Sequence, residues 1–265
     1  MAENRNKGKC SMPLSLQRRS VCELLRFSRR IPTIPVQRTV DVSSLIALRP
    51  TVSAKVGWCA IFTKAFAIVS SEMPELRRAY LRCPLERLYQ HPETVASVAI
   101  EREYRNEPGV FYANIVKPEE LTLPALETSI QRHRTEPVER IFAASLRFFR
   151  LPTLIRWSLW WYLLNVRGRR KAELLGTFAV TALSSLGAES LHPISPVTCT
   201  LTYGVITPGG TIPLRIIYDH RVMDGATIAR ALARMDEVLQ TTIRAEMESL
   251  RSEKNGTAAD VAPAN

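Results

Sequence analysis

Apolar residues recur with two different periods along the first part of the chain. From Leu16 to Arg30 they stand three or four positions apart among arginines, which predicts an amphipathic helix that ends before Pro32. From Thr33 to Val42 they alternate with polar residues, which predicts a strand. Val56 to Ser71 is apolar on nearly every side, so we expect a buried helix there.

The rest of the chain continues this alternation of helices and strands. The predicted strands are Thr94 to Ile100, Val110 to Val116, Phe178 to Leu183, Thr198 to Ile206 and Pro213 to Tyr218. The predicted helices are Leu123 to His133, Val138 to Arg150 and Ala226 to Glu246. The first two strands of this group are joined by a turn that contains Asn106, Pro108 and Gly109, and the last two by a hairpin at Pro208 to Gly210. Strands and helices that interleave in this way predict an α/β fold with a substantial sheet.

Composition agrees with one globular domain. Of the 265 residues 46% are hydrophobic and 23% are charged, which excludes a disordered chain or a fibrous repeat. No run of eighteen uncharged apolar residues occurs, so the sequence predicts no transmembrane helix. We expect a domain over residues 13–250, a disordered basic tail over 1–12 and a second disordered tail over 251–265.

The charge is less ordinary, because 36 Lys and Arg against 25 Asp and Glu give a net charge of +11. Such a chain suits a polyanion, an anionic membrane surface or a phosphate-rich ligand. No basic stripe interleaved with aromatic residues is present, so we predict no nucleic-acid binding. The five cysteines are odd in number and never spaced as C-x-x-C, and the N-terminus shows no apolar signal segment. We therefore expect reduced thiols and a cytoplasmic protein.

The segment Tyr218 to Ala226, YDHRVMDGA, carries the candidate chemistry. It places His220 directly after an apolar strand and Asp224 and Gly225 directly before a helix, in the pattern H-x-x-x-D-G. An imidazole at such a strand end can act as a general base, a nearby carboxylate can orient it, and a glycine allows a tight turn or a positive φ. The alternative is structural: His220 ends the strand and Asp224 caps the helix.

The whole string resembles the signature of the superfamily that contains the dihydrolipoyl acyltransferase domains of 2-oxoacid dehydrogenase complexes and the chloramphenicol acetyltransferases. Gly176 to Thr181 resembles the G-x-F-T-I-[ST] strand of these enzymes, and the pattern continues through Gly187 and Pro196 to Val205. The resemblance covers roughly Pro13 to Leu250. It implies a chloramphenicol acetyltransferase-like two-layer fold, in which packed helices cover a mixed β-sheet.

The resemblance also implies an activity. These enzymes move an acyl group directly between coenzyme A and a thiol or hydroxyl acceptor, in a tunnel between the subunits of a trimer. His220 matches the general base, Thr181 matches the hydroxyl that stabilises the oxyanion, and Asp224 matches the acid that organises the loop with Gly225. Arg18 and Arg19 are the candidates for an arginine that supports this acid. For Thr181 a plain strand residue remains the alternative, and for the two arginines a solvated helix face is the favoured one.

The ligands follow from the same resemblance. Coenzyme A and its acyl thioester are expected as substrates, with a small or carrier-borne acceptor and a homotrimer as the assembly. We predict no metal, because the four histidines lack ligand spacing. We also predict no covalently bound lipoate, because the chain has no lipoyl-domain lysine motif and no subunit-binding segment. The rival hypotheses are a non-catalytic trimeric scaffold or partner-binding subunit and a membrane-surface protein on the same fold.

Residues 138–171 depart from the family pattern as a longer aromatic and basic insertion. It contains three of the four tryptophans, and its most apolar stretch runs from Leu151 to Val166. Three interpretations remain open: extra core or trimer contact, the wall of a groove for an apolar acyl chain, or contact with an anionic membrane surface.

Overall fold

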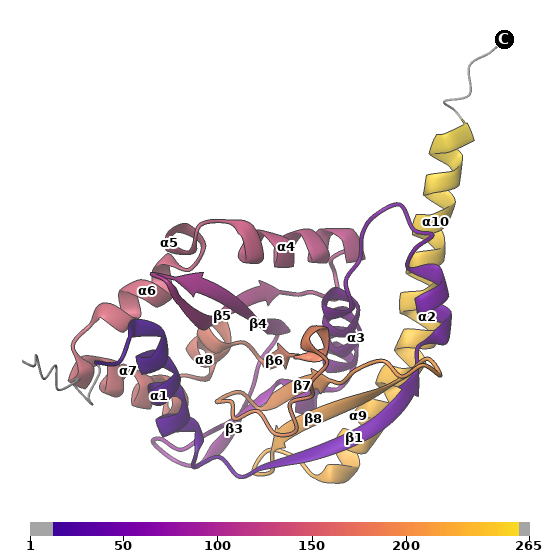
Figure 1. The fold of residues 1–265 in the computed structure, drawn as a ribbon. Helices are drawn as coiled ribbons and strands as arrows, with labels where there is room; N and C mark the ends of the chain where they lie inside the picture. The colour runs from indigo at the N-terminus through magenta and orange to yellow at the C-terminus, as the bar shows by residue number, and fades with distance from the viewer. Residues whose placement is uncertain (1–12, 260–265) are drawn as a thin grey trace, which may run out of the picture.

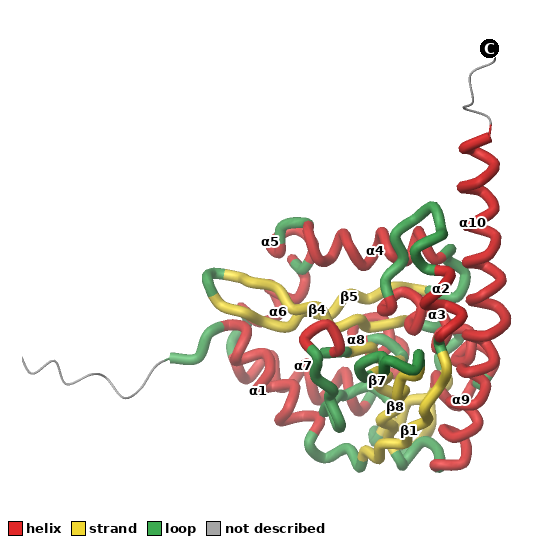
Figure 2. Tube along the Cα trace, turned by 45° about the vertical axis from the view of Figure 1, so that its right-hand side comes forward, coloured by secondary structure: helices red, strands yellow, loops and turns green. Residues whose placement is uncertain are grey.

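The computed structural model describes residues 13–259, and its centre is a six-stranded mixed sheet with the strand order β1-β8-β7-β6-β4-β5 (Figures 1 and 2). The pairs β4–β6 and β6–β7 are parallel, and the other pairs of this sheet are antiparallel. Its strands are β1 (Thr33–Asp41), β4 (Val95–Tyr104), β5 (Glu107–Val116), β6 (Phe178–Thr181), β7 (Cys199–Tyr203) and β8 (Thr211–Asp219). This confirms the predicted α/β class with a mixed sheet and packed helices.

Helix α3 packs against both α4 and α9, and all three helices pack against the sheet. Their apolar side chains form the main core, in which Phe66 of α3 meets Phe178 of β6 edge to face at 4.8 Å. The helices of the chain are α1 (Leu16–Ser28), α2 (Ser43–Leu48), α3 (Trp58–Glu72), α4 (Leu123–Thr135), α5 (Val138–Ile141), α6 (Ala143–Arg150), α7 (Thr153–Asn165), α8 (Gly168–Leu175), α9 (Gly225–Val238) and α10 (Arg244–Ala259). Short 3-10 turns at Pro74–Arg77 and Ser184–Leu186 complete the helical segments.

The β4–β5 hairpin turns earlier than the sequence predicted. Arg105 and Asn106 take positive φ values of 56° and 60°, as a two-residue hairpin turn requires, and β5 resumes at Glu107. Pro108 and Gly109 therefore lie in the strand. Gly109 serves a different need there, because a Cβ at this position would come within 2.5 Å of the Gln17 side chain of α1.

Three further features of the chain differ from the prediction. The predicted helix from Val138 to Arg150 is divided into α5 and α6 at Phe142, whose buried ring packs against Phe111 at 4.8 Å. Helix α8 was not predicted. The small antiparallel hairpin of β2 (Arg78–Leu81) and β3 (Arg87–Gln90) was also missed, because its strands are short and largely polar.

The closing helix continues beyond the predicted domain boundary. After α9 a π-helical turn over Leu239–Ile243 leads into α10, which reaches Ala259 and projects from the body (Figures 1 and 2). The prediction of a tail from residue 251 is thus wrong for residues 251–259. Met247 anchors the start of α10 in the core, and Glu246 accepts a hydrogen bond from the Leu123 amide at 2.7 Å. The predicted tail over 1–12 lies outside the described residues.

Candidate active site

The turn between β8 and α9 places His220 at the end of the sheet. Its backbone N–H donates to the Pro32 carbonyl at 3.0 Å, which ties the turn to the chain just before β1. The side chain is 42% exposed. A strand on one side and a helix on the other therefore hold an accessible imidazole on rigid backbone.

One hydrogen bond determines which nitrogen of His220 can act as a base. Nδ1 lies 3.1 Å from the Met223 carbonyl oxygen. A carbonyl only accepts, so Nδ1 carries the proton in the neutral ring. Nε2 is then left with a free lone pair, which is the form that a general base needs.

Asp224 stands at the N-cap position of α9, but it does not cap the helix through its side chain. Its carboxylate lies 3.6 Å from Nδ1 of His220 and is 85% exposed. This distance is that of an ion pair, which forms when the imidazole is protonated. The structural alternative, in which Asp224 is a side-chain cap, has no support in this geometry.

Gly225 is the first residue of α9 and does not have a positive φ. The positive φ that the sequence allowed for this glycine is therefore not used. A Cβ at this position would lie 3.4 Å from the hydroxyl of Tyr218, which is buried under the turn. Burial and the nearby Asp224 charge raise the pKa of Tyr218, so the hydroxyl stays protonated.

Thr181 is half-buried at the end of β6, and the sheet register places it far from His220 of the same chain. It pairs with Thr202, which in turn pairs with Arg215 of β8, five residues before His220. At 3.3 Å per residue and 4.8 Å per strand, the two residues are about 17 Å apart along the strands and about 10 Å across them. One chain does not bring these two candidate residues together.

Arg18 and Arg19 are exposed on α1, which packs against β5, α6 and α7. In the described part of the chain neither forms an ion pair with Asp224, whose recorded partner is His220. Within one chain the two arginines therefore do not contact this acid, and both lie on an exposed helix face.

An ion pair between a buried acid and a partly exposed arginine stabilises the turn in their place. Asp219, the last residue of β8, is buried and accepts hydrogen bonds from the Arg221 amide at 3.1 Å and from its guanidinium at 2.9 and 2.7 Å. The guanidinium also lies over the ring of Tyr80, 4.3 Å from its centre. His220 is thus flanked by two residues that hold each other in place.

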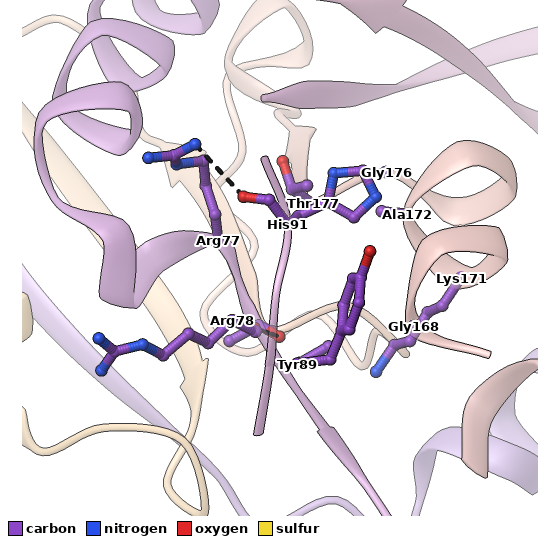
Figure 3. Close-up of a pocket in the computed structure, with 11 residues that line it drawn as sticks. Arg77, Arg78, Tyr89, His91, Gly168, Lys171, Ala172, Gly176 and Thr177 are labelled. Carbon is purple, nitrogen blue, oxygen red and sulfur yellow. Dashed lines mark hydrogen bonds between the residues drawn. The ribbon is translucent and has the colours of Figure 1, made fainter. Parts of the chain in front are cut away.

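A small pocket lies behind this turn, between the β2–β3 hairpin and α8 (Figure 3). Lys171 of α8 lines it together with Arg78, Tyr89, His91 and Thr198, and the pocket has room for about one water molecule. The Thr198 carbonyl accepts from the Asp219 amide at 2.9 Å, which joins the pocket to the end of β8. Burial lowers the pKa of Lys171 to about 8, against the opposing effect of the Asp219 charge.

Cys22, Cys59, Cys83 and Cys199 are free thiols, and Cys10 lies outside the described residues. Within the part of the chain that the structure describes, no three His, Cys, Asp or Glu side chains are grouped as metal ligands.

No protein-family model matches the sequence, and no curated protein matches it significantly. Solved structures do match. A probable dihydrolipoamide acetyltransferase from Listeria monocytogenes 4b F2365 is 18% identical, with a TM-score of 0.63 over 92% of this chain and 96% of that one. The dihydrolipoamide acetyltransferase of Azotobacter vinelandii is 18% identical, with a TM-score of 0.62 over 93% and 98%. A truncated catalytic core of the 2-oxoacid dehydrogenase multienzyme complex from Thermoplasma acidophilum is 17% identical, with a TM-score of 0.64 over 88% and 99%.

The chain has the fold of the dihydrolipoamide acetyltransferase catalytic cores. Within this acetyltransferase-core fold the turn that carries His220 follows the predicted strand, as the sequence motif indicated. Sequence reasoning missed the roles of Asp219, Arg221 and Lys171. The adjacent Asp-His-Arg was a signal for the first two, since opposite charges two positions apart can pair across a turn. Nothing local in the sequence marks Lys171, because its burial depends on the β2–β3 hairpin.

Proposed function

We propose that this protein is an acyltransferase that moves an acyl group between coenzyme A and a thiol or hydroxyl acceptor, with His220 as the general base. The observation that carries the proposal is the Nδ1–Met223 hydrogen bond, because it leaves Nε2 of an accessible imidazole unprotonated. The acetyltransferase-core fold supports the reaction class. The description of the Azotobacter protein names a serine, a histidine and an asparagine in its catalytic mechanism, and that histidine and asparagine are four positions apart, as are His220 and Asp224.

The proposed reaction uses one proton transfer in each direction. Nε2 of His220 takes the proton of the acceptor hydroxyl or thiol, and the resulting nucleophile attacks the carbonyl carbon of the acyl thioester. The tetrahedral oxyanion accepts a hydrogen bond from the Thr181 hydroxyl. Collapse breaks the carbon–sulfur bond, and the coenzyme A thiolate takes back the proton from the imidazolium. The Asp224 carboxylate lies at ion-pair distance from Nδ1 and stabilises the positive charge of the imidazolium.

The separation of Thr181 and His220 within one chain leads us to propose a site between copies. Thr181 of one copy would then serve His220 of another, as happens at a head-to-tail interface that closes in a ring such as a trimer. A further structure of this fold, at 20% identity, is described as the cubic core of the pyruvate dehydrogenase multienzyme complex, so that relative is part of an assembly.

The test is thiol release from acyl-CoA thioesters of increasing chain length, with hydroxyl and amine acceptors. Transfer to dihydrolipoamide is followed by product analysis, because that acceptor carries its own thiols. We expect His220→Ala to lower turnover by about 10²–10⁴-fold, the usual contribution of a general base. His133→Gln, a histidine on α4 whose Nδ1 donates to the Ser129 carbonyl, is the matched control. No turnover on any pair, or equal activity of the His220 variant, overturns the proposal in favour of a non-catalytic scaffold.

Mixing two inactive variants tests the shared site. Thr181→Ala is expected to lose about 10²–10³-fold in turnover, as loss of one oxyanion donor does in other enzymes. The Thr181→Ala and His220→Ala variants are mixed in equal amounts, dissociated and reassembled together. If Thr181 and His220 act across an interface, one neighbouring pair in four then has both residues intact. The mixture should therefore recover up to about a quarter of wild-type activity. If the mixed assembly regains its original mass but stays inactive, the shared site is contradicted.

A further inference from the structure

Helix α7 exposes its apolar residues and buries its charged residue, the reverse of an ordinary surface helix. Its charged residue, Arg156, is 2% exposed, whereas Leu154 is 74% exposed and Trp161 is 49% exposed. The outward stripe follows helical spacing and consists of Leu154, Ile155, Leu159, Trp161 and Tyr162, with Leu151 just before the helix. Soluble surface helices bury such a stripe. The orientation therefore requires an explanation.

Interactions from two sides hold α7 in this orientation. Arg156 donates to both carboxylate oxygens of Glu23 on α1, at 2.6 to 3.1 Å, and this pair is buried. One turn further along, Trp160 stacks on Phe27 of α1 at 5.8 Å and meets Phe148 of α6 at 5.9 Å. Rotating α7 to hide its leucines would bring Arg156 out of its ion pair. The apolar stripe is thus a fixed feature of the surface.

The β2–β3 hairpin extends the stripe. The Cys83 amide donates to the Asn165 carbonyl at 3.0 Å, and Arg87 donates to the Val166 carbonyl at 3.3 Å. These bonds place the hairpin beside the C-terminal end of α7. Leu85 at its tip is 77% exposed and Leu88 is 47% exposed. We call the α7 stripe together with Leu85 and Leu88 the apolar face.

The charge around the apolar face is positive. Between Glu139 and Glu173 the chain has no acidic residue and eight Lys and Arg. The exposed members of this group near the two ends of α7 are Arg147, Arg150, Arg167, Arg169 and Arg170. Arg169 and Arg170 pair with Glu173, and the hairpin carries one carboxylate, Glu86, which accepts from Tyr80 at 2.5 Å. The balance remains strongly basic.

We infer that the apolar face binds the surface of an anionic lipid bilayer, with α7 lying in the plane of the interface. A stripe of Leu and Ile enters the acyl region, Trp161 and Tyr162 suit the headgroup boundary, and arginines at both ends meet lipid phosphates. A second copy of this face would oppose arginines to arginines, which disfavours a symmetric contact between two such faces. No helix of the described residues is long and apolar enough to cross a bilayer, so the contact is at the surface.

Co-sedimentation with vesicles tests the inference. The full chain is mixed with vesicles of phosphatidylcholine alone or of phosphatidylcholine with about one-third phosphatidylglycerol. We expect strong pelleting with the anionic vesicles, weakened by salt. The triple variant Leu154→Ser, Ile155→Ser, Leu159→Ser is expected to lose at least about tenfold in partitioning. The double variant Leu186→Ser, Leu191→Ser, at leucines that are equally exposed elsewhere, is the matched control and should bind as the wild type does.

Three results overturn the inference: no pelleting with either vesicle, equal pelleting of the triple variant, or a fall in the light-scattering mass of the triple variant in the absence of lipid. The last would make the face a contact between copies. None of these readouts uses enzyme activity, and His220→Ala should bind vesicles normally. Failure of the acyltransferase proposal is therefore separable from failure of this one.

Tryptophan fluorescence locates the contact. Trp161 is expected to shift to shorter wavelength on anionic vesicles and to be quenched by brominated acyl chains. Trp161→Phe should remove most of the change. Trp58→Phe, which alters a residue that stacks on Phe62 in the core, should keep it. A change that survives Trp161→Phe contradicts the placement of α7 at the bilayer.

Discussion

The His220 turn and the apolar face of α7 are each held from behind by a buried acid that pairs with an arginine, but the two pairs differ in span and in solvent access. Asp219 and Arg221 are two positions apart, and the Arg221 side chain is 33% exposed. Glu23 and Arg156 lie 133 positions apart, and their side chains are 7% and 2% exposed. The first pair stiffens one turn, whereas the second joins the inserted helix to the N-terminal helix.

This difference predicts different costs of breakage. A charge left in the dry interior has no partner to replace the one that was lost, whereas water reaches a half-exposed group. A local pair also costs little chain entropy to form, whereas the long-range pair forms only after α1 and α7 have packed. The insertion should therefore depend on its ion pair more than the active-site turn does on its own.

The largest effect is expected at the long-range pair. Arg156→Met leaves the Glu23 carboxylate buried and unpaired and should lower the free energy of unfolding by about 3–5 kcal/mol. The double variant Glu23→Leu, Arg156→Met removes both charges and should recover most of this loss. Urea unfolding of the three proteins measures it. Equal stability of the single variant and the wild type would show that the pair contributes nothing.

The second largest effect on stability is expected at Lys171, which lines the pocket behind the His220 turn. Its pKa of about 8 lies below the ordinary value of 10.5, so the unfolded chain binds this proton more tightly. The charged form therefore destabilises the fold below pH 8, and this cost fades as the pH rises from 8 toward 10.5. Lys171→Met should be more stable than the wild type by about 2–3 kcal/mol at pH 7.

The advantage of Lys171→Met should shrink steadily when thermal unfolding is repeated up to pH 9.5. Taking the difference between the two proteins cancels the other groups that titrate in this range. A stability advantage of Lys171→Met that grows with pH would contradict the lowered pKa of Lys171.

Breaking the local pair should cost less. Arg221→Met removes the guanidinium from Asp219 but keeps the amide hydrogen bond, and water can reach the vacated space. We expect a loss of about 1–2 kcal/mol in unfolding free energy. Turnover should fall as well if the pair positions His220, and Arg221→Lys should restore part of it. A stability loss as large as that of Arg156→Met removes the contrast between the two regions.

The smallest effect is expected for Asp224→Asn. The carboxylate is largely exposed and lies 3.6 Å from the imidazole, so solvent screens its attraction for the imidazolium. Turnover should change by less than about tenfold, with stability unaltered. A loss as large as that of His220→Ala would assign Asp224 a direct part in the reaction.

Periodicity and turn chemistry placed most of the sheet and its main helices, because those segments bury one face whatever the rest of the chain does. The predictions failed where tertiary contacts overrode local preference. Phe142 interrupts a continuous helical pattern because its ring fills a cluster with Phe111. Gly109 lies in a strand and not in the turn, at a place where the Gln17 side chain leaves no room for a Cβ. The end of α10 was predicted as a tail from its polar composition, yet it continues the helix that Met247 anchors.

The sequence by itself determined the position of His220 and Asp224 at a strand-to-helix turn, since an apolar strand, a short polar segment and an amphipathic helix are all local signals. Tertiary structure decided which imidazole nitrogen is free, which residues flank the base, and that Thr181 lies far from His220 of the same chain. It also decided that α7 faces outward. A stripe of leucines indicates a face to be covered but not its partner, and here the buried Glu23 turns that stripe away from the core.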